Sequence, residues 1–146
     1  MAEGKQRRTG SCLCGAVRFS IELPTLACAH CHCSMCRRAH GAAFATWVIL
    51  GEEQVEVLSG ADRLVHYESS PGARRSFCGV CGSSLFFAGE HFPGQVHVVL
   101  ANIEGKIDRG PEMHVFFSDR ADWVELADNL PRLGGPTGME LVAEDG

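Results

Sequence analysis

The sequence predicts an all-β domain whose short antiparallel strands are held together by cysteine-rich turns. Short apolar runs recur along the 146 residues with glycine and proline between them, and only two segments have a helical pattern. The eight cysteines fall into three groups instead of being scattered. Because chains of about 100–200 residues usually form one domain, we assign residues 10–126 to a single domain. The remaining residues, 127–146, are rich in glycine, proline and acidic side chains without periodicity, and we expect a loosely packed C-terminal tail.

The strand assignments follow from alternation and from the turn residues between the runs. Val17, Phe19 and Ile21 alternate with polar residues and predict a half-buried strand that ends at Pro24. The same reasoning predicts these further strands: Phe44–Leu50, Val55–Leu58, Leu64–Tyr67, Arg75–Cys78, Leu85–Phe87, Val96–Leu100 and His114–Phe117. Short helices are predicted over two segments: Cys33–His40 and Ser118–Leu126. Ser118 is the expected N-cap of the second helix. About eight or nine strands at this spacing are typical of an antiparallel sandwich or barrel-like fold.

Composition excludes several classes of protein. The formal net charge of -5 provides no basic face for nucleic acid. No apolar stretch approaches the roughly 18 residues that span a membrane, and residues 1–10 are polar and basic without the apolar core of a signal peptide. We therefore expect a cytoplasmic protein. In a reducing cytosol the eight cysteines favour metal binding over a disulfide framework.

Two pairs of cysteines are spaced for one closed zinc site. One turn carries Cys12 and Cys14. A second turn carries Cys78 and Cys81, and a glycine directly follows each pair. Two thiolates on a tight turn fill two corners of a zinc tetrahedron without strain, so two such turns complete it. The glycines permit a positive φ, which lets backbone N–H groups approach the sulfurs. We predict a structural zinc site that joins distant strands, so loss of the metal should remove much of the stability.

The third group of cysteines predicts the active site. Cys31, Cys33 and Cys36 supply three thiolates within six residues, and catalytic zinc is normally held by three protein ligands with one open position. One alternative is that Cys28 completes a closed, purely structural four-thiolate site. Another is an iron–sulfur cluster, because clustered cysteines also bind such clusters.

Arginine pairs accompany two of the cysteine groups. Arg37 and Arg38 directly follow Cys36, and Arg74 and Arg75 precede the last metal turn. Their charges would either compensate the thiolates or hold an anionic substrate.

The cysteine motifs also carry a resemblance to a known family. They read Cys12-x-Cys14-Gly15, His30-Cys31-His32-Cys33-x-x-Cys36-Arg37 and Phe77-Cys78-x-x-Cys81-Gly82. In order and spacing they resemble the glutathione-dependent formaldehyde-activating enzyme family, which also includes centromere protein V, over roughly residues 10–126. The resemblance implies a β-tent fold with two zinc ions. It places the structural ion on Cys12, Cys14, Cys78 and Cys81 and the catalytic ion on Cys31, Cys33 and Cys36, in agreement with the spacing, while Cys28 lies outside the family's pattern.

The resemblance implies a carbon–sulfur lyase-type enzyme that condenses glutathione with formaldehyde to S-(hydroxymethyl)glutathione. Its partners would be a small thiol and an aldehyde. Coordination to zinc deprotonates a thiol and so creates the nucleophile for the aldehyde carbon. Because glutathione carries two carboxylates, we expect Arg37 to bind one of them. Two alternatives are a non-catalytic zinc module that binds a partner protein and a lyase of the same fold that acts on another sulfur compound.

Overall fold

The computed structural model describes residues 6–142. The first five residues of the polar N-terminus and the last four of the predicted tail lie outside these residues. The described chain is mostly strand with one α-helix, α1 (Ser34–His40), so the predicted all-β class is confirmed. No helix between residues 6 and 142 has the length and apolar character needed to cross a membrane.

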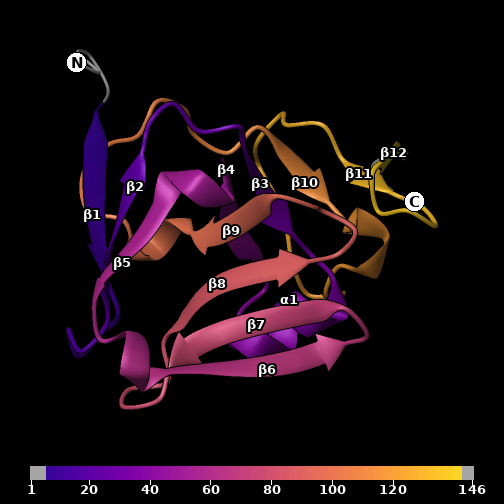
Figure 1. The fold of residues 1–146 in the computed structure, drawn as a ribbon. Helices are drawn as coiled ribbons and strands as arrows, with labels where there is room; N and C mark the ends of the chain where they lie inside the picture. The colour runs from indigo at the N-terminus through magenta and orange to yellow at the C-terminus, as the bar shows by residue number, and fades with distance from the viewer. Residues whose placement is uncertain (1–5, 143–146) are drawn as a thin grey trace.

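The strands form two main sheets and a small C-terminal pair. Their bounds are β1 Arg7–Ser11, β2 Arg18–Glu22, β3 Ala27–Cys31, β4 Ala45–Gly51, β5 Val55–Ser59, β6 Leu64–Ser70, β7 Ala73–Cys78, β8 Ser84–Gly89, β9 Gln95–Val99, β10 Met113–Val115, β11 Leu133–Gly134 and β12 Glu140–Leu141. One sheet has the order β1-β2-β5 and the other β10-β3-β4-β9-β8-β7-β6. Neighbouring strands are antiparallel, except that β10 runs parallel to β3. Figure 1 shows the three-stranded sheet and the β11–β12 pair at opposite ends of the molecule.

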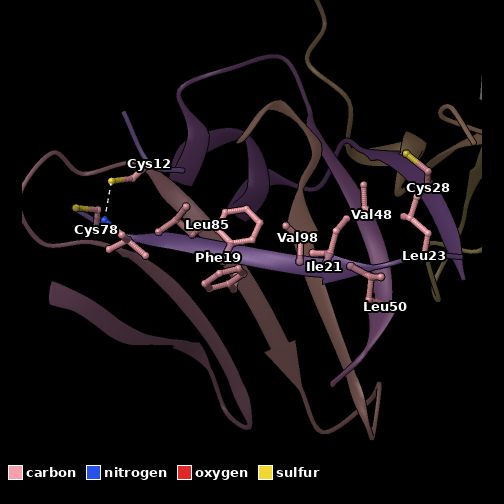
Figure 2. Packing of buried hydrophobic residues seen from close by; sticks show 12 residues of the cluster. Cys12, Phe19, Ile21, Leu23, Cys28, Val48, Leu50, Cys78, Leu85 and Val98 are labelled. Atoms are coloured by element: carbon pink, nitrogen blue, oxygen red, sulfur yellow. Dashed lines mark hydrogen bonds between the residues drawn. The ribbon is translucent and has the colours of Figure 1, made fainter. Parts of the chain in front are cut away.

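The larger hydrophobic core lies between the two main sheets. Phe19 and Ile21 of β2 are fully buried, as their alternation predicts, and Figure 2 shows them beside Leu85 and Val98 of the larger sheet. Gly10 of β1 pairs with Phe19, and a side chain at Gly10 would collide with the Phe19 ring. A second buried cluster forms around Cys31, Cys36 and Trp47 beneath α1. Cys12 and Cys78 belong to the first cluster, whereas Cys31 and Cys36 belong to the second.

The sequence missed four strands and predicted one helix wrongly. Strand β1 has the polar sequence RRTGS, which carries no apolar alternation, and it forms because it pairs along the edge of β2. Strand β3 is made of small residues and cysteines; β11 and β12 have two residues each. The predicted helix Ser118–Leu126 is instead a single 3-10 turn at Phe117–Asp119 followed by turns, and Ser118 is not an N-cap. Between residues 120 and 126 only Ala121 is buried, and a nine-residue helix needs packing of an apolar face to be stable.

The segment after residue 126 makes defined contacts with the rest of the domain. Asp128 accepts a hydrogen bond from buried His114 at 3.0 Å. It also forms an ion pair with Arg132, whose guanidinium donates to it at 2.9 Å. Arg132 itself is 9% exposed, and Leu133 packs against the second hydrophobic cluster. Composition suggested a tail because the contacts of this segment are made by a few charged side chains and not by an apolar stripe.

Candidate functional site

The four-cysteine cluster joins the two main sheets. Cys12 and Cys14 lie in the turn between β1 and β2, and Cys78 and Cys81 lie at the turn between β7 and β8. The four sulfur atoms lie within 4.8 Å of one another. Two of their separations are 3.7 Å, from Cys12 to Cys14, and 3.9 Å, from Cys14 to Cys78. Tetrahedral zinc with Zn–S bonds of about 2.3 Å requires sulfurs about 3.8 Å apart, so this donor set fits the ion.

The glycine after each pair has the conformation that the sequence predicts. Gly15 has φ 84° and Gly82 has φ 82°, values that favour glycine. Backbone N–H groups donate to the sulfurs on these turns, from Val17 to Cys12 at 3.3 Å, from Ala16 to Cys14 at 3.4 Å and from Val80 to Cys78 at 3.4 Å. Bonds of this kind stabilise the thiolate form.

Cys81 has its own source of stabilisation. Hydrogen bonds from the side chain and backbone of Ser83 lower the pKa of Cys81 to about 5. A thiol with so low a pKa is ionised at neutral pH, and metals bind the thiolate form. The four sulfurs lie close enough together to hold a metal ion.

The three-cysteine cluster lies where β3 passes into α1. Cys31 ends β3, and the sulfur of Cys33 caps α1 by accepting a hydrogen bond from the backbone N–H of Cys36 at 3.2 Å. The three sulfurs lie within 4.8 Å of one another. Cys31 and Cys36 are buried, whereas Cys33 is half-buried. This cluster can also hold a metal ion, on three ligands.

Two side chains outside the cluster act on Cys36. The Trp47 indole N–H donates to its sulfur at 3.4 Å, and both terminal nitrogens of Arg75 donate at 3.6 and 3.7 Å. Hydrogen bonds from Cys31 and Cys33, followed by smaller effects of Arg75 and Trp47, hold the pKa of Cys36 far below its ordinary value. Cys31 takes the opposite role, because the neighbouring Cys33 and Cys36 raise its pKa. The contacts from Trp47 and Arg75 thus favour the thiolate form of Cys36.

Cys28 does not belong to this cluster. Side chains alternate along β3, so Cys28 points into the core between the sheets while Cys31 points into the other hydrophobic cluster. Figure 2 shows Cys28 packed near Leu23, at the opposite end of the core from Cys12. Burial raises the pKa of Cys28 to about 11. Within residues 6–142, no fourth histidine, cysteine or carboxylate atom lies within 4.8 Å of all three sulfurs, so the closed four-thiolate alternative is not formed.

A pocket of about 580 Å³ adjoins the three-cysteine cluster. Its lining comes from α1 and from strands β4, β6, β7 and β8, and Figure 1 shows α1 beside β7 and β8. Trp47 and Arg75 line this pocket and also bond to the Cys36 sulfur, so the pocket wall touches the cluster. Arg38 lines it as well.

Arg37, which the sequence predicts to bind the substrate, lies away from this pocket. Its guanidinium donates to the backbone oxygen of His32 at 3.3 Å and to that of Asp119 at 3.1 Å. Arg37 does not line the pocket. Its bonds tie α1 to the chain after β10, while the pocket side of the helix belongs to Arg38.

Sequence reasoning missed a buried histidine pair beside the cluster. His32 Nε2 and His114 Nδ1 lie 2.8 Å apart, and Asp128 accepts from His114 Nε2. Both rings are fully buried, and the parallel pairing of β3 with β10 sets His114 opposite His30. His114 lies within the apolar run at residues 113–117, and this position was the one sequence signal for a buried histidine. Its partner His32 is 82 residues away in the chain, so the pair itself could not be predicted.

Comparisons with known proteins agree with this architecture. The family model described as "Glutathione-dependent formaldehyde-activating enzyme" matches residues 7–119. A Halomonas elongata protein named "Putative glutathione-dependent formaldehyde-activating enzyme" is 34% identical over 125 residues, which cover 80% of this chain and 79% of the relative. A Schizosaccharomyces pombe protein named as an uncharacterized lyase is 37% identical over 81 residues, covering 54% of this chain and 56% of the relative. A crystal structure of a Rhodobacter sphaeroides protein superposes with a TM-score of 0.59 at 31% identity, covering 69% of this chain and 92% of that one.

Proposed function

The chain belongs to the glutathione-dependent formaldehyde-activating enzyme family, and from this premise we propose that it is a zinc-dependent carbon–sulfur lyase-type enzyme. Its reaction would be the addition of glutathione to formaldehyde, or the reverse cleavage of S-(hydroxymethyl)glutathione. The names of the relatives support an enzyme of this class.

The observation that carries the proposal is the difference between the two cysteine clusters. Four sulfurs meet in the cluster between the sheets, which is the ligand number of a closed structural zinc site. Three sulfurs meet at the start of α1, next to a pocket of about 580 Å³. Three protein ligands and an accessible fourth position are the arrangement of catalytic zinc.

The proposal assigns two zinc ions per chain. Zinc on Cys31, Cys33 and Cys36 would supply Lewis acidity, which lowers the pKa of a nearby thiol and polarises an aldehyde oxygen.

The chain's own residues prepare the site for this chemistry. Trp47 and Arg75 donate to the Cys36 sulfur, so they hold its side chain in place and balance part of its negative charge. Trp47 and Phe86 contribute apolar surface to the pocket wall. The pocket would bind the thiol substrate, and the aldehyde would meet it beside Cys36.

The alternative of a non-catalytic zinc module depended on Cys28 as a fourth ligand. Because Cys28 lies in the other hydrophobic cluster, its position favours the open site. A lyase that acts on another sulfur compound remains a distinct outcome of the experiment below. The cytoplasmic location expected from the sequence is part of the proposal.

Exchange NMR tests the proposed reaction. Formaldehyde and glutathione also combine without protein, so the measured quantity is the rate of interconversion with the adduct above that background. Zinc-loaded wild type should accelerate this exchange, and zinc-loaded Cys33→Ser should not, because Cys33 is a ligand only of the three-cysteine cluster. Equal rates for wild type and background would reject the reaction, and acceleration of exchange with another thiol alone would point to the other lyase.

A further inference from the structure

The pocket beside the three-cysteine cluster is cationic, although the chain as a whole carries a net charge of -5. Two guanidinium groups, those of Arg38 and Arg75, line it, and among the described residues no aspartate or glutamate does. The apolar faces of Trp47, Phe77 and Phe86 make up other parts of the wall. A pocket of this composition fits a small anion with an apolar stem.

Arg75 is held rigidly at the boundary between the pocket and the cluster. Its Nε donates to the Ser69 hydroxyl at 3.2 Å, and its carbon Cζ lies 5.2 Å from the centre of the Phe87 ring. Its two terminal nitrogens each use one N–H toward Cys36. A guanidinium has five N–H donors, so two of those on Arg75 remain for a ligand. A fixed guanidinium loses little conformational freedom when it binds a carboxylate.

Two further groups on the pocket wall lack partners. Arg38 is exposed, and its side chain makes no hydrogen bond or ion pair within residues 6–142. The Nε2 atom of His40 is buried and has no hydrogen-bond partner in the same part of the chain. A buried polar atom without a partner is costly unless a ligand or water satisfies it. His40 is thus a polar residue of the pocket wall whose Nε2 atom is satisfied by no described residue.

We propose that Arg75 and Arg38 together bind a carboxylate of the thiol substrate, and that this contact selects thiols bearing an acidic group. Because Arg75 also contacts the Cys36 sulfur, a carboxylate bound to it keeps the thiol end of the same molecule close to the three-cysteine cluster. The inference deepens the proposed function and rests on it, since it takes the thiol as the substrate of this site. It assigns carboxylate recognition to the pocket face of α1 and to β7, not to Arg37.

The test measures binding without chemistry. S-Methylglutathione cannot form a thiolate, so its dissociation constant reports recognition of the remainder of the molecule. Its dimethyl ester, in which both carboxylates are capped, is the matched ligand. Calorimetric titrations would compare zinc-loaded wild type with Arg75→Ala and Arg38→Ala. Arg74→Ala is the matched control protein, because Arg74 neighbours Arg75 on β7 but is exposed and does not line the pocket.

We expect Arg75→Ala and Arg38→Ala each to raise the Kd for S-methylglutathione about tenfold, since a charged hydrogen bond is lost, and Arg74→Ala to leave it unchanged. The dimethyl ester should bind wild type about tenfold more weakly, and the two variants should bind the ester no more weakly than wild type does. Because Arg38 is exposed on α1, its variant tests the inference even where Arg75→Ala loses metal or fold.

Three results would overturn the inference: no binding of S-methylglutathione to wild type, unchanged affinity in both variants, or an equal loss of affinity for the acid and the ester. The last would give Arg75 only the structural role of holding Cys36. Adduct exchange measured on the same wild-type sample separates the two hypotheses. Binding that depends on the arginines without any acceleration would reject the proposed reaction alone, whereas acceleration without such dependence would reject the carboxylate site alone.

Discussion

Cys81→Ser should destabilise the protein more than Cys33→Ser, although both side chains are half-buried. The reason is the length of chain that each cluster closes. Cys14 and Cys78 are 64 residues apart, and the turn with Cys14 and the strand end with Cys78 belong to different sheets. Cys31 and Cys36 belong to one local segment. A cross-link restricts the unfolded chain more strongly as the closed loop becomes longer. Treating each metal cluster as a cross-link gives about 4 kcal/mol for the long loop and about 2 kcal/mol for the short one.

These free energies convert into measurable melting temperatures. For a chain of this size, each kcal/mol corresponds to about 3 °C in Tm, so Cys81→Ser should lower Tm by about 12 °C and Cys33→Ser by about 6 °C when each variant loses its metal. The assay is calorimetric melting of zinc-loaded proteins with the metal content determined on the same samples. Metal-free wild type and both metal-free variants should melt within a few degrees of one another. Equal shifts for the two zinc-loaded variants would refute the assignment of the strand-joining role to the four-cysteine cluster.

Three further substitutions test other parts of the structure. Cys28→Ala should leave the metal content and the rate of adduct exchange at wild-type values. It should lower the free energy of unfolding in urea by about 1 kcal/mol, because core atoms are lost. Loss of one metal ion would instead show that Cys28 is a metal ligand. Asp128→Ala should cost about 2 kcal/mol at pH 7 because it leaves fully buried His114 without its acceptor. Burial raises the pKa of Asp128, but hydrogen bonds from His114 and Leu130 and the nearby charges of His114 and Arg132 together lower it. This difference in stability should therefore be present above the ordinary value of 3.8 and disappear as the pH falls through the lowered pKa. A variant as stable as wild type at pH 7 would contradict the docking of the C-terminal segment. Burial lowers the pKa of His97 to about 4, so below pH 6.5 the unfolded chain binds a proton there that the folded chain does not. Wild type should therefore lose stability as the pH falls from 6.5 toward 4, and His97→Gln should lose less over that range. Parallel pH profiles of stability for the two proteins would exclude this cause.

The parts of the fold that the sequence predicted are those with a local signal. The alternation of Val17, Phe19 and Ile21 and the glycine after each cysteine pair act within a few residues, and the structure agrees with both. Strand β1 had no such signal, because it exists through pairing with β2. The predicted helix after Ser118 had a suitable cap residue, but no apolar face packs there to support it.

In the candidate site, too, the sequence predicted the residues that have a local signal and missed those brought together by the fold. The spacing of the seven cysteines indicated two clusters, and the same seven sulfurs meet in the structure. Spacing alone did not decide whether Cys28 is a metal ligand, because only the alternation along β3 shows which hydrophobic cluster its side chain enters. The groups that surround the three-cysteine cluster, Trp47, Arg75 and His114, come from strands distant in sequence, so their roles depend on sheet order.

The proposed reaction requires that the three-cysteine cluster keep a metal position open for the thiol substrate. Cobalt accepts the same thiolate ligands as zinc and has visible absorption that depends on its ligands. Glutathione added to the cobalt-substituted protein should change this absorption, because its sulfur joins the three from Cys31, Cys33 and Cys36. S-Methylglutathione should cause no such change, and Cys33→Ser should abolish the response to glutathione. A spectrum that glutathione leaves unaltered in wild type would contradict the open site.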